Sequence, residues 1–100
     1  MQQIVWEFRV AVEHREEFER VYRNDGDWAK LFSRSAGFHG TTLLRDPAVA
    51  GRYLTIDSWS DAGAFRRFQE ECAAEYKALD AKCETLTEYE VKIGAFEALL

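Results

Sequence analysis

The chain contains little cysteine, with only Cys72 and Cys83 among its 100 residues. If one helix carries both, their spacing along the chain separates them by about 16 Å along the helix axis, which is too far for a disulfide bond. Neither cysteine has a histidine cluster beside it, as a zinc site would require. We therefore expect both to be buried apolar side chains, and we expect no metal site.

Basic residues are also few: 13 Lys and Arg stand against 18 Asp and Glu, for a net charge of −5. Binding to phosphate groups requires clustered Lys and Arg, and here the arginines are scattered among acidic residues. The composition therefore disfavours nucleic acid and membrane surfaces as partners. No apolar run approaches the roughly 18 residues of a membrane helix, and residues 1–3 lack the basic start of a signal peptide. We expect a cytoplasmic protein.

Familiar catalytic motifs are missing. The sequence has no P-loop, no Gly-x-Gly-x-x-Gly, no His-Glu-x-x-His and no Cys-x-x-Cys. Gly37 and Gly40 have the spacing of a phosphate clamp but no basic residue beside them, and a helix end followed by a strand start explains both. Ser33 and Ser35 have no local base. These absences disfavour phosphate binding and serine hydrolysis.

Hydrophobic periodicity, by contrast, is strong. Apolar residues alternate over 4–11 as in a strand, and recur every three or four residues along 65–86 as in an amphipathic helix. A helix of that length allows a break near Ala73 or Asp80. The expected elements are a strand over 4–11, helices over 14–23 and 27–36, strands over 38–45 and 52–59, a helix from an N-cap at Ser60 or Asp61 to Leu86, and a strand over 87–95.

This order is βαββαβ with one additional helix in the first crossover, the ferredoxin-like pattern. We predict a single α+β domain over residues 1–100, in which a four-stranded antiparallel sheet has its helices on one face. The other face is too apolar to remain in water. The residues in question are Val5, Leu54 and Ile56, or Tyr89, Val91 and Ile93. A second copy packed face to face covers them, so we expect a homodimer.

Several segments carry a family resemblance: 6–10 leading into 16–18, then 37–41, then 53–59 followed by Ala64-Phe65. With these residues, nearly the whole chain resembles the antibiotic biosynthesis monooxygenase family of dimeric α/β barrels. The resemblance implies ferredoxin-like protomers that dimerise into a barrel, with a small-molecule cavity between sheet and helices in each protomer. Members include cofactor-independent oxygenases of polycyclic aromatic substrates and haem-degrading oxygenases.

The haem-degrading branch is a poor match. Those relatives use an asparagine on the first strand, a tryptophan at the end of the third strand and a histidine on the following helix. Trp59 matches the tryptophan, but Phe8 occupies the asparagine position and residues 61–86 contain no histidine. A haem iron without an axial ligand is poorly held. We therefore expect no cofactor.

Two residues are candidate catalytic bases, Asp57 and His39. Asp57 shares one face of its strand with Thr55 and Trp59, and a carboxylate among aromatic rings has a raised pKa and accepts protons near neutrality. The alternative is that an arginine, such as Arg9 or Arg45, pairs with it. His39 titrates near neutrality and either faces the cavity or lies at a strand edge, in solvent or at the dimer interface.

Aromatic residues are numerous and suit a flat ligand. The candidate substrate-binding residues are Trp6, Phe8, Tyr22, Trp28, Phe32, Thr55, Trp59 and Tyr76. We expect a cofactor-independent monooxygenase acting on a small aromatic or quinone-like metabolite. The alternatives are a non-catalytic homodimer that binds a small hydrophobic molecule, and a structural dimer whose interior is filled solid.

Overall fold

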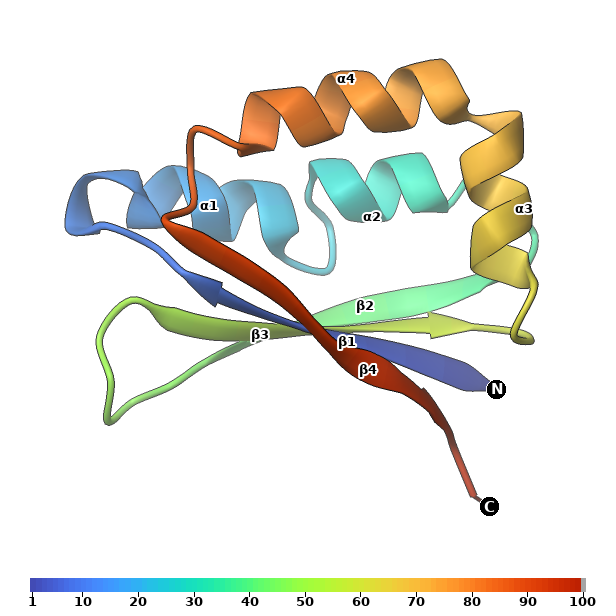
Figure 1. The fold of residues 1–100 in the computed structure, drawn as a ribbon, viewed down its shortest axis with the longest axis horizontal. Helices are drawn as coiled ribbons and strands as arrows, with labels where there is room; N and C mark the ends of the chain where they lie inside the picture. Colours follow the sequence, from blue (N-terminus) through green and yellow to red (C-terminus); the bar gives the residue numbers. More distant parts are fainter. Residues whose placement is uncertain (100) are drawn as a thin grey trace.

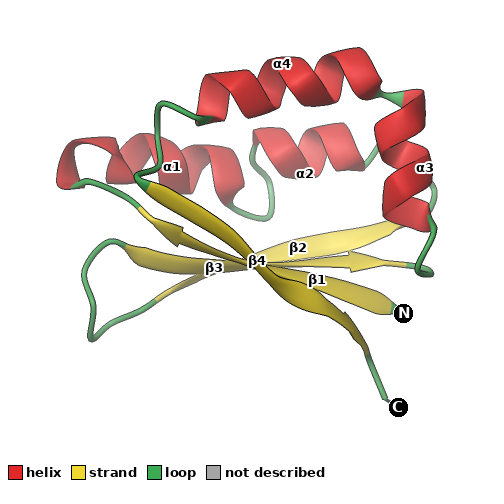
Figure 2. Cartoon of the chain, viewed as in Figure 1, coloured by secondary structure: helices red, strands yellow, loops and turns green. Residues whose placement is uncertain are grey.

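Four strands form one antiparallel sheet in the spatial order β2-β3-β1-β4, and the helices lie on one of its faces (Figures 1 and 2). A computed structural model describes residues 1–99. Its elements are β1 (Gln2–Arg9), the 3-10 turn η1 (Val12–His14), α1 (Arg15–Tyr22), α2 (Asp27–Phe32), β2 (Phe38–Arg45), β3 (Arg52–Trp59), α3 (Ala64–Glu71), α4 (Ala73–Cys83) and β4 (Tyr89–Glu97). The predicted ferredoxin-like βαββαβ fold is confirmed.

The central strand β1 pairs with β3 on one side and β4 on the other, so alternation along β1 determines both faces of the sheet. Ile4, Trp6 and Phe8 point toward the helices, opposite the residues of β3 that share their face. The first strand begins and ends two residues earlier than predicted, and the last strand two residues later. Strand pairing determines where each strand begins and ends. Val10, the residue after β1, has no partner in the β1–β3 register, and its N–H donates to the carbonyl of Gly51 in the loop before β3.

The predicted long helix is two helices, α3 and α4. The break lies at Cys72, whose backbone leaves helical geometry (φ −118°, ψ 35°). This agrees with the predicted break near Ala73, and no break occurs at Asp80. The turn redirects the chain, so that α4 lies over α2 while α3 stands at the end of the sheet (Figure 1). Cys72 is half-buried, Cys83 is buried and neither forms a disulfide.

The start of α3 differs from the prediction. Neither Ser60 nor Asp61 is the N-cap, because Gly63 holds that position. The Ser60 N–H donates to the Gly37 carbonyl and so prolongs the strand pairing. The Asp61 carboxylate accepts a hydrogen bond from the Gly63 N–H (2.9 Å), which stabilises a turn. The helix itself begins at Ala64.

Rings fill the space where the end of β3 meets α2 and α3. The Trp59 ring lies 5.2 Å from those of Phe32 and Phe38, 5.3 Å from Phe65 and 5.7 Å from Phe68, measured between centroids. Trp59 is 0% exposed. Packing of this density stabilises the fold but leaves no space for a ligand beside the indole.

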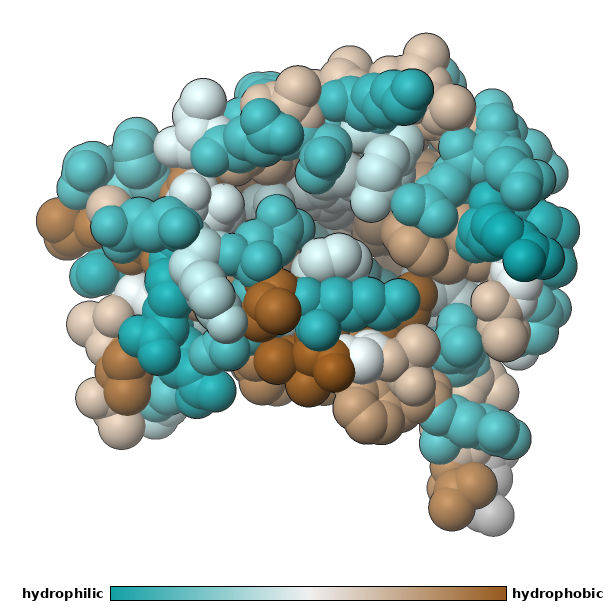
Figure 3. Space-filling model, in the orientation of Figure 1, coloured by the Kyte–Doolittle hydropathy of each residue, from teal (hydrophilic) through white to brown (hydrophobic). Residues whose placement is uncertain are grey.

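The sheet face opposite the helices is uncovered and carries both apolar and polar side chains. The apolar ones are Val5, Leu44, Leu54, Ile56, Tyr89, Val91 and Phe96, and the polar ones are Gln3, Glu7, Arg9, Thr42, Arg52 and Ser58. Leu44, Tyr89 and Phe96 are 43%, 47% and 51% exposed, and Ile93, at a bulge in β4, is 49% exposed. Brown, hydrophobic atoms are visible along this side of the sheet in Figure 3. None of the helices within residues 1–99 has the length and hydropathy to cross a membrane.

Candidate functional site

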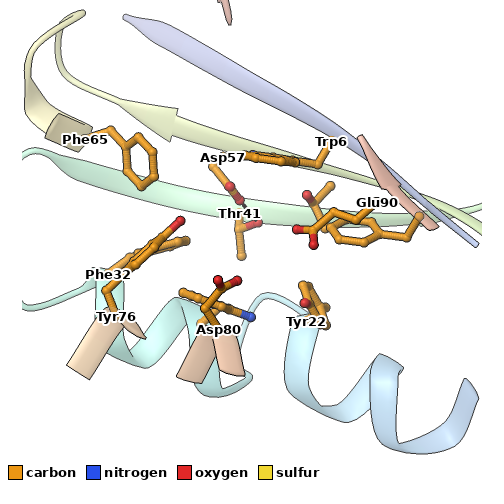
Figure 4. A pocket seen from close by; sticks show the side chains of 12 residues that line it. Trp6, Tyr22, Phe32, Thr41, Asp57, Phe65, Tyr76, Asp80 and Glu90 are labelled. Carbon is orange, nitrogen blue, oxygen red and sulfur yellow. Dashed lines mark hydrogen bonds between the residues drawn. The ribbon is translucent and has the colours of Figure 1, made fainter. Parts of the chain in front are cut away.

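A pocket lies between the sheet and the helices (Figure 4). Its lining residues are Trp6, Phe8, Tyr22, Trp28, Phe32, Thr41, Thr55, Asp57, Phe65, Tyr76, Asp80 and Glu90. The empty space between these side chains, including the part open to solvent at the mouth, is about 460 Å³. Little of this space is wide enough for water, so the pocket is a narrow slot.

Strand register builds the floor of the pocket. Trp6 lies opposite Thr55 in the β1–β3 pair, and Thr41 lies opposite Asp57 in the β2–β3 pair. Residues that face each other across an antiparallel pair project to the same side of the sheet. Thr55 and Asp57 are two positions apart on β3, so the floor combines three polar side chains, Thr41, Thr55 and Asp57, with the ring of Trp6.

Helix periodicity builds the walls. Trp28 and Phe32 are four residues apart on α2, and Tyr76 and Asp80 are four residues apart on α4, so each pair shares a helix face. The Trp28 ring contacts both Phe32 and Tyr76 at centroid distances of 5.4 Å. Phe65 of α3 also lines the pocket. These rings are packed against one another, so the walls hold their positions without a ligand.

Asp57 is the titratable group on the floor. The Thr41 hydroxyl donates a hydrogen bond to Asp57 Oδ1 at 2.5 Å, which is drawn as a dashed line in Figure 4. Burial raises the pKa of Asp57 from its ordinary value of 3.8 to about 6, and the Thr41 hydrogen bond opposes this shift. A carboxyl group with this pKa is mostly ionised at neutral pH but accepts a proton easily.

The predicted alternative, an arginine paired with Asp57, is wrong. Arg9 lies 3.9 Å from Glu7, and Arg45 lies 3.7 Å from Glu19. Among residues 1–99, no Lys, Arg or His forms a salt bridge with Asp57. Among these residues, no neighbouring positive charge therefore lowers the pKa of Asp57.

Two further carboxylates line the pocket, Asp80 on α4 and Glu90 on β4. Partial desolvation of its carboxyl group beside the pocket raises the pKa of Glu90, and the charge of Asp80 raises it further. Glu90 is exposed and Asp80 is half-buried, so the pocket opens to solvent between α4 and β4. Figure 3 shows a hollow on this side of the molecule.

Sequence reasoning missed four lining residues: Thr41, Phe65, Asp80 and Glu90. Helix spacing places Asp80 one turn after Tyr76, which would have been a signal for Asp80. Thr41 and Glu90 depend on strand register, and nothing in the local sequence specifies how β2 and β4 align with their neighbours.

Seven of the eight predicted binding residues line the pocket, and the eighth, Trp59, lies behind its wall. The Trp59 ring packs against Phe32 and Phe65, both of which face the pocket. His39 is exposed on β2 and is not part of the lining. Within the described part of the chain, no three His, Cys, Asp or Glu residues are grouped as a metal ion would require.

Comparison with known proteins identifies the family. Residues 1–80 match the model of the family described as antibiotic biosynthesis monooxygenase. SnoaB from Streptomyces nogalater, a cofactor-independent oxygenase, is 26% identical, with a TM-score of 0.73 over 99% of this chain and 93% of that chain. A structure from Deinococcus radiodurans, described as an antibiotic biosynthesis monooxygenase, is 18% identical, with a TM-score of 0.76 over 100% and 94% of the two chains. No curated protein sequence matches this chain significantly. With four-fifths of its length matched by the family model, the chain belongs to the antibiotic biosynthesis monooxygenase family.

Proposed function

We propose that the protein is a cofactor-independent monooxygenase of a small aromatic or quinone-like substrate. The observation that carries the proposal is Asp57, a desolvated carboxylate without a cationic partner on the floor of a pocket walled by aromatic rings. SnoaB, which shares 26% of its residues over nearly the whole chain, is described as a cofactor-independent oxygenase and supports the same reading.

The first step is proton abstraction by Asp57. The substrate is a phenol, or a ring whose CH₂ group is acidified by an adjacent carbonyl group. Asp57 takes the proton and the substrate becomes a phenolate or carbanion. A base performs this task best when its pKa is near the working pH, and the pKa of about 6 for Asp57 meets that requirement.

The substrate anion then reduces oxygen directly. It gives one electron to O₂, and the resulting substrate radical and superoxide combine in a C–O bond to form a peroxide. Protonation of the peroxide and loss of water convert the CH₂ group to a carbonyl group. One oxygen atom stays in the product and the other leaves as water, so CH₂ and O₂ become C=O and H₂O. The substrate supplies all the electrons.

The pocket supports this chemistry by its shape. The narrow slot between Trp6 on the floor and the aromatic side chains of the helices leaves little space for water. Excluding water protects the anion from reprotonation before it meets O₂.

Oxygen uptake tests the proposal. An anthrone and 1-naphthol, each incubated with the protein in an oxygen electrode cell, are expected to be oxidised faster than with heat-denatured protein. With ¹⁸O₂, mass spectrometry of the anthrone product should show one labelled oxygen atom. Oxidation no faster than the denatured control for both probes, together with measurable binding, would instead support the non-catalytic binding dimer.

We also propose that the uncovered sheet face pairs with a second copy of the chain. The support is chemical: Leu44, Tyr89, Ile93 and Phe96 are each between 43% and 51% exposed on or beside one sheet. Exposed large apolar side chains on a sheet face are typical of an interface, and a symmetric dimer covers the same residues on both subunits at once.

A charged residue at the centre of this face should separate the dimer. Wild-type protein is expected to sediment at twice the chain mass of 11.6 kDa, and Ile56→Glu at the chain mass, because the new carboxylate would be buried without a partner. Val12→Glu is the control, since Val12 is 71% exposed and lies off the sheet. Analytical ultracentrifugation at micromolar concentration gives the answer. A monomeric wild type, or a dimeric Ile56→Glu, would rule out pairing through this face.

A further inference from the structure

The charges of the pocket all have one sign. Three of its twelve lining residues are acidic, Asp57, Asp80 and Glu90, and none is Lys, Arg or His. They come from three different elements, β3, α4 and β4, and Figure 4 shows their carboxylates directed into the same space. Among the described residues they are not grouped closely enough to hold a metal ion, and no cationic side chain of the lining offsets their charge.

The aromatic walls favour the same sign of ligand charge. The rings are Trp6, Phe8, Tyr22, Trp28, Phe32, Phe65 and Tyr76. The face of an aromatic ring is electrostatically negative and attracts ammonium groups. An anionic ligand would meet negative ring faces and three carboxylates, with no cation among the lining residues to offset them.

The buried indole N–H of Trp28 does not decide between ligands. Trp28 lines the pocket, and its N–H has no hydrogen-bond acceptor among residues 1–99, but the same is true of Trp59, which lies outside the pocket. An ammonium group is a donor only and would not pair with this N–H.

We propose that the ligand of this pocket is an arylalkylamine in its protonated form, with its ring between the aromatic walls and its ammonium group, which is attached to a saturated carbon, between Asp80 and Glu90 at the mouth. The inference names the substrate class for the function proposed above and rests on that function for the reaction, but not for binding. The ammonium group relieves the repulsion between Asp80 and Glu90, which face the opening from α4 and β4. Asp57, deeper on the floor, remains free to act as the base.

Three naphthalene probes that differ in one group test the charge preference: 1-naphthylmethylamine, 1-naphthalenemethanol and 1-naphthoate. We expect the amine to bind at least about tenfold more tightly than the alcohol, and the carboxylate to bind more weakly than the alcohol. Isothermal titration calorimetry at pH 7.5 measures all three. Equal or tighter binding of the alcohol or the carboxylate would overturn the inference, and so would the absence of binding by all three.

Substitution of the two carboxylates at the mouth tests whether they bind the ammonium group. Asp80→Asn and Glu90→Gln are each expected to weaken amine binding by roughly three- to tenfold, with little change for the alcohol, because each removes a charge and keeps the shape. Glu70→Gln, an exposed change on α3 outside the pocket, is the control and should bind like wild type. Equal losses for amine and alcohol would mean that the carboxylates only shape the pocket, and would overturn the inference.

Binding and turnover separate this inference from the proposed function. Selective amine binding without oxygen uptake, for an arylalkylamine that is also a phenol, would leave the inference standing and remove the monooxygenase. Oxygen uptake with neutral or anionic substrates, together with weak amine binding, would do the reverse.

Discussion

Asp57→Asn is expected to lower the turnover number of oxygenation by about 100- to 10,000-fold and to leave ligand affinity nearly unchanged. Asparagine keeps the shape of the side chain and can still accept the Thr41 hydrogen bond, but it cannot take up the substrate proton. Oxygen-electrode kinetics and calorimetry on the same variant give the two quantities. Equal loss of turnover and affinity would show that Asp57 binds the ligand and is not the base.

The pH profile tests the same role. Because Asp57 acts as its carboxylate and has a pKa of about 6, kcat/KM should rise with pH below about 6 and level off above it. Thr41→Val should move the midpoint to higher pH, since the Thr41 hydrogen bond lowers the pKa of Asp57. A midpoint that does not move would show that another group controls the rate.

The raised pKa also has a consequence for stability. Since the folded pKa of Asp57 is about 6 and its ordinary value is 3.8, the native state binds more protons than the unfolded state between these values. The free energy of unfolding should therefore decrease as the pH rises through this window, by up to about 3 kcal/mol. Asp57→Asn should lack this component and so be more stable than wild type at pH 8. Urea unfolding at pH 4 and pH 8, at one protein concentration, compares the two proteins.

Trp59→Ala is expected to lower the free energy of unfolding by about 3–5 kcal/mol. Trp59 is 0% exposed and contacts four phenylalanine rings, so its removal leaves a large cavity in the core. Urea denaturation followed by circular dichroism measures the loss. A loss below 1 kcal/mol would mean that the surrounding rings collapse into the space, contrary to this packing.

Trp6→Ala is the matched control, because Trp6 is the half-buried tryptophan on the pocket floor. It should cost less stability than Trp59→Ala and weaken ligand binding more. Trp59 acts on the pocket only through Phe32 and Phe65, which it holds in place. The opposite ranking of the two variants would assign the binding wall to Trp59 instead.

Much of the site was predictable from periodicity alone. Alternation along 52–59 places Thr55, Asp57 and Trp59 on one face, and the structure places that face toward the helices. The three- and four-residue spacing along 65–86 likewise predicted which side of α3 and α4 packs inward. The side of a helix or strand that is buried follows from the local sequence, because apolar side chains are removed from water however the rest of the chain folds.

The sequence by itself determined the order of the elements, their buried faces and the family. The tertiary structure decided where the interior is solid and where it is hollow. Trp59 and Phe65 are both predicted to face inward, yet Trp59 is enclosed by other rings while Phe65 borders the pocket. The difference depends on how far α4 stands from the sheet after the turn at Cys72, and on the register that places Thr41 beside Asp57. Both are set by packing between segments distant in the chain, which no local pattern specifies.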